Sequence, residues 1–548
     1  MSAKAGRLLA LLAAAIFLAV WFSGLEYRKL AKTDEGRYAE IPREMVVTGD
    51  WLTPRLNGIK YFEKPPLQYW GTALAYEAFG VRQWTSRLWP AFTGLLGILA
   101  AWLGARRLYG EPAGRIAAMV CASMLLYEAM AHIDTLDMGL AGFMAWALSG
   151  FLCAQTAGSE RAVSGWMALS WFATALAVLS KGLVAILLPG LTLALYSLLL
   201  REFSFWRRLR PLLGVLILAL VAVPWFVAVS IANPEFPQFF FIHEHFTRFL
   251  TKVHRRVQPW WFFFPILLAG MLPWTISAVP AALRAWREKT GGQGFRPGPF
   301  LLVYCAVVFA FFSASGSKLP SYILPLFPAA AILIGAYLPQ VAPRHFAWQI
   351  APAAVLGLVM LVAAPLLAPS FRNADAPLEM YLRFARWQQA GGAFLLAGAA
   401  AAWLLCARKR LVAAAAATAM SALVGFQVVT AGYDELHPLA SSWQIASQVK
   451  PLLQPDTPFY SVRIYEQALP FYLERPVTLV AYGDEFEYGL KQEPWRAIDS
   501  LPPFEQRWRE APVAFALMQR GLYEKLRADG LPMSIVASDP KRVIVRNK

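Results

Sequence analysis

Long uncharged apolar stretches recur along the whole chain and are separated by short charged loops. Most of them reach the roughly 18 residues that an α-helix needs to cross about 30 Å of hydrocarbon. A weaker stretch around 116–127 extends past Glu128. Together they predict a polytopic α-helical membrane protein with about 13 transmembrane helices. The longer stretches are 8–25, 88–105, 138–159, 162–180, 182–200, 211–234, 257–283, 297–317, 319–343, 346–371, 388–407 and 411–433.

Composition and charge support this class and set the expected topology. The 548 residues are 58% hydrophobic and 16% charged, whereas soluble domains average roughly 45–50% apolar and about 25% charged residues. Basic clusters occupy alternate loops, beginning with Lys4 and Arg7, so the positive-inside rule predicts a cytoplasmic N-terminus and an external C-terminus. The same asymmetry explains the formal net charge of +17 and disfavours a nucleic-acid partner. The stretch 8–25 lacks a small-residue cleavage site and is expected to be a retained helix.

The pattern divides the chain into a transmembrane domain, 1–433, and an external C-terminal α/β domain, 434–548. In the latter, β-rich runs such as TPFYSVRIY and KRVIVRN alternate with turns and with the amphipathic piece QRGLYEKLRADG. The external loop 26–83 holds two segments that are too short to span, 38–47 and 67–79, and both are predicted to lie along the membrane interface. Neither GxxxxGK[ST] nor a strand-bound GxGxxG occurs, so nucleotide chemistry is not expected.

Acidic residues gather at the predicted outer ends of two spans. Asp34 and Glu35 follow the first span, and Asp134 and Asp137 lie in the sequence HIDTLDMG before another. Residues three apart share a face of an α-helix, so a helix that starts at Asp134 would present both carboxylates on one side. Alternatively, Asp134 or Thr135 would cap that helix. We expect the acids to surround a positively charged substrate or to orient an attacking group.

Basic residues in the outer loops break the positive-inside pattern, and an anionic ligand is the simplest reason. Lys, Arg and Tyr side chains suit a phosphate as a point charge, a bidentate fork and a hydroxyl donor respectively. Alternatively, the cations bind lipid headgroups or pair with acids of the same loops, although an exposed pair contributes only about 0–1 kcal/mol. The residues concerned are Arg37, Lys64, Arg248, Lys318 and Tyr322.

A metal site in the outer loops is a further hypothesis, and the sequence requires no cofactor. His243 and His245 in FIHEHF, with a carboxylate from Glu63, are ligand types that suit Zn²⁺ or Mg²⁺. Their spacing matches no finger or HExxH helix, and both histidines would alternatively form hydrogen bonds at a wet interface. The four cysteines lie far apart in apolar stretches, which predicts neither a disulfide nor a CxxC metal pair.

The opening loop carries the signature DEGRYAEIPREM followed by GDWLTPRLNGIKYFEKPPLQYW. This stretch closely resembles the first external loop of the bacterial 4-amino-4-deoxy-L-arabinose lipid A transferases. These are relatives of the protein O-mannosyltransferases among the GT-C membrane glycosyltransferases. The predicted topology extends the resemblance more loosely over the whole chain, and PPLQYW departs from members that lack the second proline.

The resemblance implies transfer of 4-amino-4-deoxy-L-arabinose from undecaprenyl phosphate to lipid A phosphates at the periplasmic face of the inner membrane. Single displacement with inversion is the implied chemistry, and resistance to polymyxin and other cationic peptides is the implied consequence. Membrane lipids are the expected surroundings, without a nucleotide sugar. By position, Asp34, Glu35, Arg37 and Asp137 are implied to be catalytic. Lys64, Arg248, Lys318 and Tyr322 are assigned to the donor phosphate, and Tyr38, Tyr61 and Asp134 to substrate binding.

Two other functions stay open on the sequence. A polyprenyl-phosphate-dependent enzyme that moves a neutral sugar to protein or cell-wall glycan would share the DE pair. A lipid flippase or secondary transporter would instead need charges near the middle of the membrane, interrupted helices and internal repeats. The apolar stretches here carry almost no central charges, which disfavours transport.

Overall fold

The computed structural model describes residues 3–247, 258–288, 294–372 and 376–547, with backbone alone at 3–7, 9–10 and 243–247. The chain forms two compact units, and each unit draws on segments that are far apart in the sequence. The first unit is Met1–Leu25, Arg87–Ala363 and Gln388–Thr430, and the second is Glu26–Ser86, Ala364–Trp387 and Ala431–Lys548.

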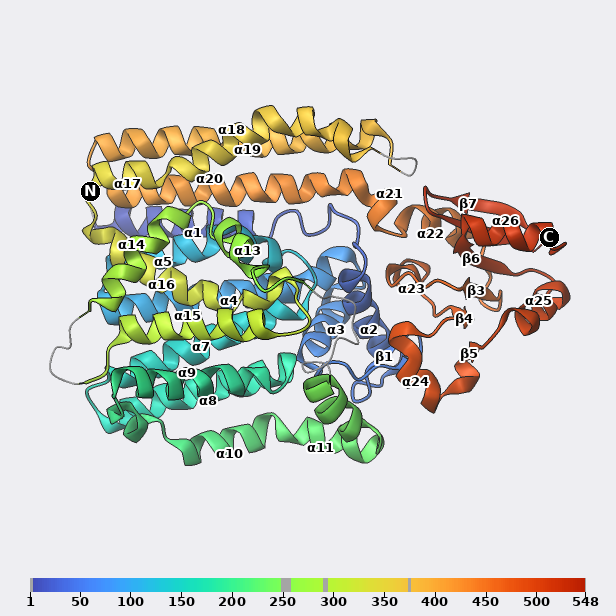
Figure 1. Ribbon diagram of the computed structural model, residues 1–548, viewed down its shortest axis with the longest axis horizontal. Helices are drawn as coiled ribbons and strands as arrows, with labels where there is room; N and C mark the ends of the chain where they lie inside the picture. Colours follow the sequence, from blue (N-terminus) through green and yellow to red (C-terminus); the bar gives the residue numbers. More distant parts are fainter. Residues whose placement is uncertain (1–2, 248–257, 289–293, 373–375, 548) are drawn as a thin grey trace. The chain divides into compact units, whose positions relative to one another are not determined.

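The first unit is a bundle of apolar helices that run side by side (Figure 1). Within the described residues, eight helices are long and apolar enough to cross a membrane, or up to ten if each bent pair is one span. The predicted polytopic helical architecture is confirmed, while the count of about 13 spans stays a prediction. The helices are α1 (Ala3–Trp21), α4 (Gln83–Tyr109), α5 (Glu111–Ser123), α6 (Leu125–Ala131), α7 (Leu136–Gln155), α8 (Glu160–Lys181), α9 (Val184–Leu200), α10 (Pro211–Val221), α11 (Val223–Ala232), α13 (Phe263–Gly270), α14 (Thr275–Trp286), α15 (Pro297–Ala314), α16 (Leu326–Tyr337), α17 (Pro343–Gln349), α18 (Ala351–Leu367), α19 (Leu378–Ala407) and α20 (Leu411–Gly432).

Two predicted spans are broken rather than straight. The stretch around 116–127 forms α5 and α6, which meet at 67°, and the described part of 257–283 forms α13 and α14, which meet at 101°. Pro273 lies in the second break, where a proline cannot donate the helical hydrogen bond. The expectation of one continuous helix over 257–283 was therefore wrong, because apolar length does not exclude a break.

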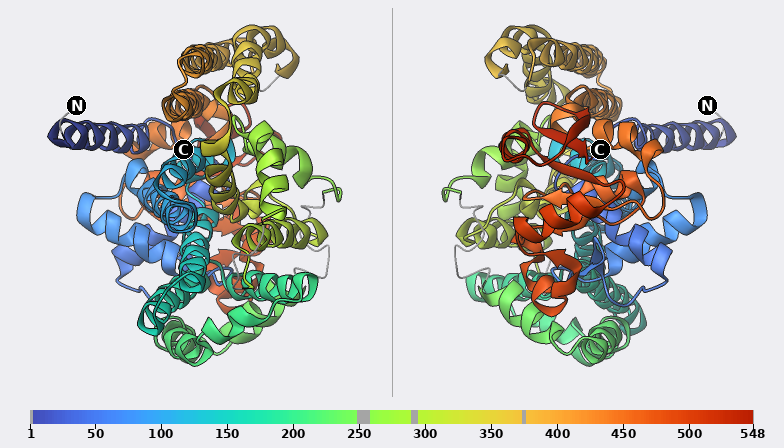
Figure 2. Two further views of the ribbon diagram at one scale, coloured as in Figure 1. Left: turned by 90° about the vertical axis from the view of Figure 1, so that its left-hand side faces the viewer. Right: turned by 90° about the vertical axis from the view of Figure 1, so that its right-hand side faces the viewer.

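Helix α7 is the central helix of the bundle, and 94% of its 18-residue apolar stretch is buried. Small residues allow this close packing. A Cβ atom at Gly142 would lie 2.3 Å from the carbonyl oxygen of Thr93 on α4, so a larger side chain would push the two helices apart. Both views of the bundle place α10 and α18 at opposite edges (Figure 2). Because α7 is tightly enclosed, the position of its first turn is fixed.

The second unit begins with the opening loop. Its two predicted helices form as α2 (Asp34–Thr48) and α3 (Leu67–Phe79). The polar face of α2 is buried as well as its apolar face, because Arg43 donates two hydrogen bonds of 2.6 Å to the carboxylate of Glu40. The predicted position of both helices along the membrane interface stays a prediction.

A short hairpin joins α2 and α3. Strands β1 (Arg55–Leu56) and β2 (Ile59–Lys60) pair antiparallel around Asn57 and Gly58. These two residues have φ values of 56° and 74°, as a two-residue hairpin turn requires. The Asn-Gly dipeptide is a strong sequence signal for such a turn, and this hairpin was not among the predicted elements.

The opening loop shares a core with the C-terminal part of the chain in this unit. Helix α2 packs against α23 (Ala468–Leu473), and a Cβ atom at Gly36 would lie 2.3 Å from the backbone nitrogen of Ala468. Glycine at this position therefore lets the two helices touch through their backbones. The buried residues of this core are Leu30, Ala39, Tyr76, Ala468 and Phe471.

The C-terminal part forms a six-stranded mixed sheet of order β5-β4-β3-β6-β8-β7. Strand β3 is parallel to β4 and β6, while β8 is antiparallel to β6 and β7. Every strand except the two-residue β5 lies in a predicted β-rich run, so the α/β prediction is confirmed, while the limits 1–433 and 434–548 stay a prediction. The elements are α21 (His437–Ala440), α22 (Trp443–Val449), β3 (Phe459–Val462), β4 (Thr478–Val480), α24 (Glu487–Gln492), β5 (Ala497–Ile498), α25 (Leu501–Glu510), β6 (Phe515–Gln519), α26 (Arg520–Ala528), β7 (Ser534–Ser538) and β8 (Arg542–Arg546).

Candidate active site

Asp137 lies in the first turn of α7, where two neighbouring elements supply its partners. The Lys181 ammonium at the end of α8 forms an ion pair with Oδ1, and the Ser321 hydroxyl donates to Oδ2 at 2.8 Å. The side chains of Asp137 and Lys181 are 10% and 14% exposed. Both carboxylate oxygens are thus engaged, and Asp137 is a firmly oriented anion.

The segment after α15 carries two more of the predicted residues. Lys318 is buried, and its ammonium donates to the carbonyl oxygens of Ser315 at 2.7 Å and Gln258 at 3.2 Å. An ammonium group has three donors, so within the described residues a third hydrogen is available to an anion. The ring centroid of Tyr322 lies 4.3 Å from the Lys181 nitrogen, within the range of a cation–π contact. We call Asp137, Lys181, Ser321 and Tyr322 the Asp137 cluster.

Asp134 does not lie on α7. The helix begins at Leu136, and Thr135 is its N-cap residue with an extended backbone. The prediction that Asp134 and Asp137 share a helix face was therefore wrong, because the extended residue separates Asp134 from the first turn. Thr135 makes no side-chain cap hydrogen bond, and Asp134 is fully buried. Asp134 is therefore not a member of the Asp137 cluster.

Asp34 is the first residue of α2 and is partly open to solvent, with 32% of its side-chain surface exposed. Within the described part of the chain, its one ion pair is the 3.5 Å contact from Oδ1 to Nη1 of Arg37. The N-terminus of a helix favours a carboxylate through the helix dipole. Asp34 therefore combines a stabilised charge with oxygen lone pairs that a ligand can reach.

Arg37 is held between the opening loop and the C-terminal sheet domain of the same unit. Its Nη2 atom pairs with the Glu485 carboxylate, and its guanidinium carbon lies 5.6 Å from the ring centroid of Tyr61. The buried Tyr61 hydroxyl has no hydrogen-bond partner among the described residues. Burial raises the pKa of both Tyr38 and Tyr61. Both phenols consequently stay protonated and can donate a hydrogen bond.

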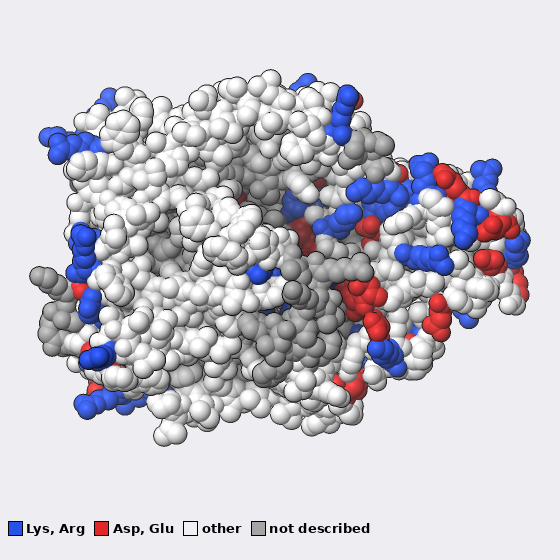
Figure 3. Space-filling model, viewed as in Figure 1, with Lys and Arg blue, Asp and Glu red and all other residues white. Residues whose placement is uncertain are grey.

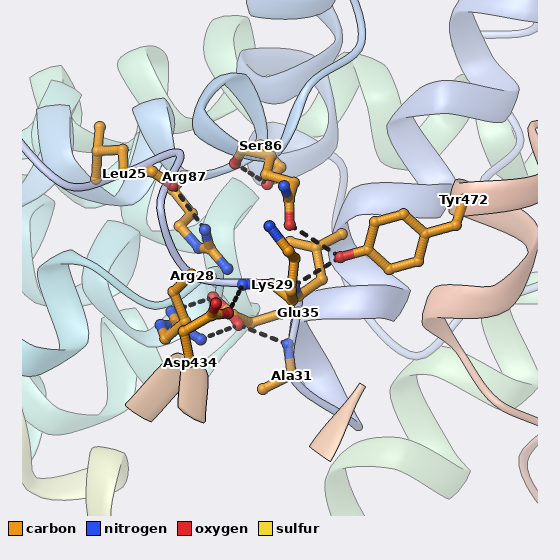
Figure 4. Close-up of polar contacts among 11 residues, drawn as sticks. Leu25, Arg28, Lys29, Ala31, Glu35, Ser86, Arg87, Asp434 and Tyr472 are labelled. Atoms are coloured by element: carbon orange, nitrogen blue, oxygen red, sulfur yellow. Dashed lines mark hydrogen bonds and ion pairs between the residues drawn. The ribbon is translucent and has the colours of Figure 1, made fainter. Parts of the chain in front are cut away.

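Glu35 is committed to the structure of the loop itself (Figure 4). Its carboxylate accepts two hydrogen bonds from Arg28, at 2.5 and 2.7 Å, and one from the backbone N–H of Ala31 at 2.8 Å. The two side chains are 2% and 6% exposed. The carboxylate of Asp434 and the hydroxyl of Tyr472 accept the two backbone N–H groups that follow Arg28. This network orients the start of α2 and with it Asp34.

The remaining predicted residues are Lys64, Glu63, His243, His245 and Arg248. Lys64 is half-buried, and its ammonium donates to the carbonyl oxygen of Glu63 at 2.7 Å. The side chains of His243 and His245, and the whole of Arg248, lie outside the described residues. Elsewhere in the described chain, no group of three His, Cys, Asp or Glu side chains could hold a metal ion. The metal hypothesis on Glu63 and the two histidines stays a prediction.

Three residues of these clusters were not among the sequence predictions. Lys181 carried a usable signal, because it is a cation at the predicted outer end of an apolar span and so breaks the positive-inside pattern. Ser321 lies beside Tyr322, and a serine in an apolar loop has no specific signal. Glu485 lies in GDEFEYG, whose acids match no motif. Its proximity to Arg37 follows from the packing of chain segments that are 448 positions apart.

Two protein families match parts of the chain. Residues 7–240 match the family described as dolichyl-phosphate-mannose-protein mannosyltransferase. Residues 445–547 match the family described as aminoarabinose transferase C-terminal domain. The first match covers the opening loop and the Asp137–Lys181 pair, and the second covers the six-stranded sheet.

Curated relatives and solved structures extend these matches. Undecaprenyl phosphate-alpha-4-amino-4-deoxy-L-arabinose arabinosyl transferase of Pseudomonas aeruginosa strain UCBPP-PA14 is 35% identical over 65% of this chain and 66% of its own length. The Erwinia tasmaniensis enzyme of that name is 34% identical over 59% of this chain and 58% of its own. These alignments thus span somewhat less than two thirds of the relatives. ArnT from Cupriavidus metallidurans, crystallised with undecaprenyl phosphate, is 39% identical over 100% of this chain and 99% of its own, with a TM-score of 0.94.

Proposed function

This chain belongs to the family of the undecaprenyl phosphate-aminoarabinose arabinosyltransferases, and we propose that it transfers 4-amino-4-deoxy-L-arabinose from undecaprenyl phosphate to lipid A phosphate groups. The observation that carries the proposal is the similarity over the whole chain to an ArnT whose structure holds undecaprenyl phosphate. The enzyme is a membrane-embedded, multi-pass glycosyltransferase of the GT-C class that uses a polyprenyl-phosphate-linked donor. Its proposed location is the bacterial inner membrane, with the reaction at the periplasmic face.

The acceptor determines what the protein has to supply. A phosphate monoester has a second pKa near 6, so its attacking oxygen is already anionic at neutral pH. In a single displacement, that oxygen forms a bond to the anomeric carbon while the bond from this carbon to the undecaprenyl phosphate oxygen breaks. The configuration inverts and undecaprenyl phosphate leaves with the electron pair. A strong general base is therefore unnecessary, and positioning and charge stabilisation become the main requirements.

Asp34 is the proposed group for the sugar. The 4-amino group is a cation at neutral pH, and a partly exposed carboxylate with one long ion pair can bind it. The buried pair of Arg28 and Glu35 would act through Asp34 by fixing the start of α2. Glu35 is accordingly proposed as a positioning residue, since its oxygens are occupied by Arg28 and Ala31.

The basic and phenolic side chains are proposed to hold the phosphate of the donor. Arg37 and Lys64 in the opening loop would stabilise the charge that grows on the leaving group, and the Tyr61 hydroxyl offers a donor that lacks a protein partner in the described chain. In the helix bundle, Lys318 has a third donor that no described residue accepts, and Tyr322 lies beside Lys181. Arg248 keeps its proposed phosphate role, and Asp137 is proposed to orient Lys181.

The decisive measurement is the mass spectrum of lipid A from cells that make the donor but lack their own transferase. Expression of this chain should add the aminoarabinose increment, and Asp34→Asn or Lys64→Ala should remove it at equal protein levels. Asp50→Asn is the matched control, because Asp50 is an acid of the same loop whose Oδ1 caps the turn at Leu52 and Thr53. Lipid A without the aminoarabinose increment, in cells that contain both the donor and this protein, would contradict the proposal. A reporter that is active only outside the cytoplasm, fused to the C-terminus, tests the orientation.

A further inference from the structure

An open cavity of about 630 Å³, lined by both polar and apolar side chains, lies at the end of the helix bundle that is opposite to Asp137. It is formed where α4 and α14 end and where α16 passes into a short 3₁₀ turn, Leu338–Gln340. Its polar lining comes from Tyr109, Arg284, Arg287, Glu288 and Gln340. The cavity is therefore separate from the candidate active site, and the transfer reaction assigns it no role.

The two arginines of this cavity differ from others at the same end of the bundle. Arg106 pairs with Glu111 at 2.6 Å, and Arg208 donates to backbone carbonyl oxygens at the end of α7. Among the described residues, neither the Arg284 nor the Arg287 guanidinium has a side-chain hydrogen bond or an ion pair. Two guanidinium groups that form no ion pair within the described residues thus line one cavity.

The one acid in the lining, Glu288, forms its hydrogen bonds with other groups. Glu288 accepts the backbone N–H of Gly298 at 2.6 Å and the Tyr109 hydroxyl at 3.4 Å. Burial raises the pKa of Glu288, while the nearby Arg296 and Arg284 act in the opposite direction. Two guanidinium groups against one such carboxyl leave the cavity positive, and guanidinium forks match the geometry of phosphate oxygens.

The surroundings place the cavity at the level of lipid headgroups. Helix α14 exposes Leu283 and Trp286, with 55% and 50% of their surface accessible, as expected for side chains that contact lipid. Tryptophan is enriched where hydrocarbon meets headgroups. Figure 3 shows a belt of uncharged side chains along the bundle and basic side chains at the end where α14 and α17 lie. A ligand here would have its polar part in the cavity and its chains along α14.

We propose that Arg284 and Arg287 bind the phosphodiester headgroup of an anionic phospholipid from the leaflet at this end of the bundle. Basic pockets between membrane helices are known to suit such headgroups. The occupant is a lipid rather than free phosphate, because the cavity adjoins exposed apolar side chains of α14. By the positive-inside rule this leaflet is cytoplasmic. The site rests on membrane embedding alone and is independent of the sugar-transfer function.

Native mass spectrometry of the full-length protein in detergent tests the site, with phosphatidylglycerol as the probe. The wild type should retain phosphatidylglycerol, and Arg284→Gln/Arg287→Gln should retain about tenfold less, the loss expected for charge-assisted hydrogen bonds. The control is Arg408→Gln/Arg410→Gln, which removes the same charge from an exposed turn outside the cavity lining. This control should retain the lipid as the wild type does.

Three results would overturn the inference. One is equal retention of phosphatidylglycerol by the wild type and the Arg284/Arg287 variant. Another is a loss of phosphatidylglycerol in the Arg408/Arg410 control that equals the loss in the Arg284/Arg287 variant. The third is displacement of phosphatidylglycerol by inorganic phosphate at millimolar concentration, which would indicate a site for a soluble anion. The single variants Arg284→Gln and Arg287→Gln should each show part of the loss, so a folding defect in the double variant leaves the test intact. Lipid A modification should persist in these variants, because the site is remote from Asp137.

Discussion

Asp34 and Asp137 both lie in the first turn of a helix, yet their surroundings differ. Asp137 is buried, and its two oxygens are taken by Lys181 and by the 2.8 Å hydrogen bond from Ser321. Asp34 is 32% exposed and has one ion pair of 3.5 Å within the described chain. An acid whose lone pairs are used by its neighbours can orient those neighbours, whereas an open acid can bind a ligand. The comparison supports the proposals that Asp34 binds the sugar and that Asp137 has a positioning role.

Asp137 and Asp34 also differ in how far along the sequence their partners lie. The partners of Asp137 come from distant helix ends of the bundle, at separations of 44 and 184 positions. Arg37, the partner of Asp34, lies one helical turn away, and it is held in turn by Glu485 of the C-terminal sheet domain. The bundle thus orients one acid directly. The opening loop holds Asp34 indirectly, through Arg37 and its contact with Glu485.

The largest expected effect is the loss of transfer on Asp34→Asn. The amide keeps the shape but removes the charge, so the initial rate should fall by about 10²- to 10³-fold. The apparent melting temperature should hardly change, because one long ion pair is lost. Rates and thermal unfolding of the purified variant beside Asp50→Asn check this. A fall in melting temperature that matches the lost activity would remove Asp34 from the ligand-binding role.

The second prediction concerns the pair of Asp137 and Lys181. Lys181→Met leaves a buried carboxylate without its ion pair, so it should lower both the melting temperature and the rate, the latter by about tenfold. In the double variant Asp137→Asn/Lys181→Met the buried charge is gone, and the melting temperature should recover while the rate stays low. Recovery of both quantities would mean that Asp137 is structural and has no positioning role in transfer.

The third prediction separates Glu35 from its neighbour Asp34. Glu35→Gln removes the carboxylate charge from a buried bidentate pair with Arg28, which should destabilise the protein by about 3–5 kcal/mol. The Michaelis constant for the donor should stay near the wild-type value for the molecules that remain folded. Thermal unfolding together with active-site titration tests this. A raised Michaelis constant without destabilisation would place Glu35 in contact with substrate.

The smallest expected effect is a dependence of stability on pH that originates in α2. Burial and the adjacent Glu40 raise the pKa of Glu44 to about 8, so the folded state keeps a proton that the unfolded chain releases at lower pH. The stabilisation is present below the ordinary carboxyl pKa and is lost as pH rises toward about 8. The melting temperature of the wild type should therefore fall from pH 5 to pH 9, and Glu44→Gln should flatten this slope. Exposed Glu524→Gln is the control and should leave it unchanged.

Several features of the fold followed from the sequence because they depend on local patterns. Helix α3 has the limits 67–79 that its apolar pattern predicts, since the two prolines before Leu67 prevent an earlier start. The strands β3 and β8 lie in the predicted β-rich runs for the same local reason. The break at Pro273 shows where this reasoning ends, because apolar length alone predicts a span but not its straightness.

The chain by itself determined the class of protein, the helical and α/β elements, and the loop motif that holds Asp34, Arg37 and Lys64. Apolar length, charge asymmetry and a contiguous signature are properties of neighbouring residues, which any sequence displays. Only the tertiary structure decided which acid is open and which is enclosed. The pairing of Asp137 with Lys181 and Ser321, and of Arg37 with Glu485, depends on helix packing between distant segments. No local pattern encodes those distances.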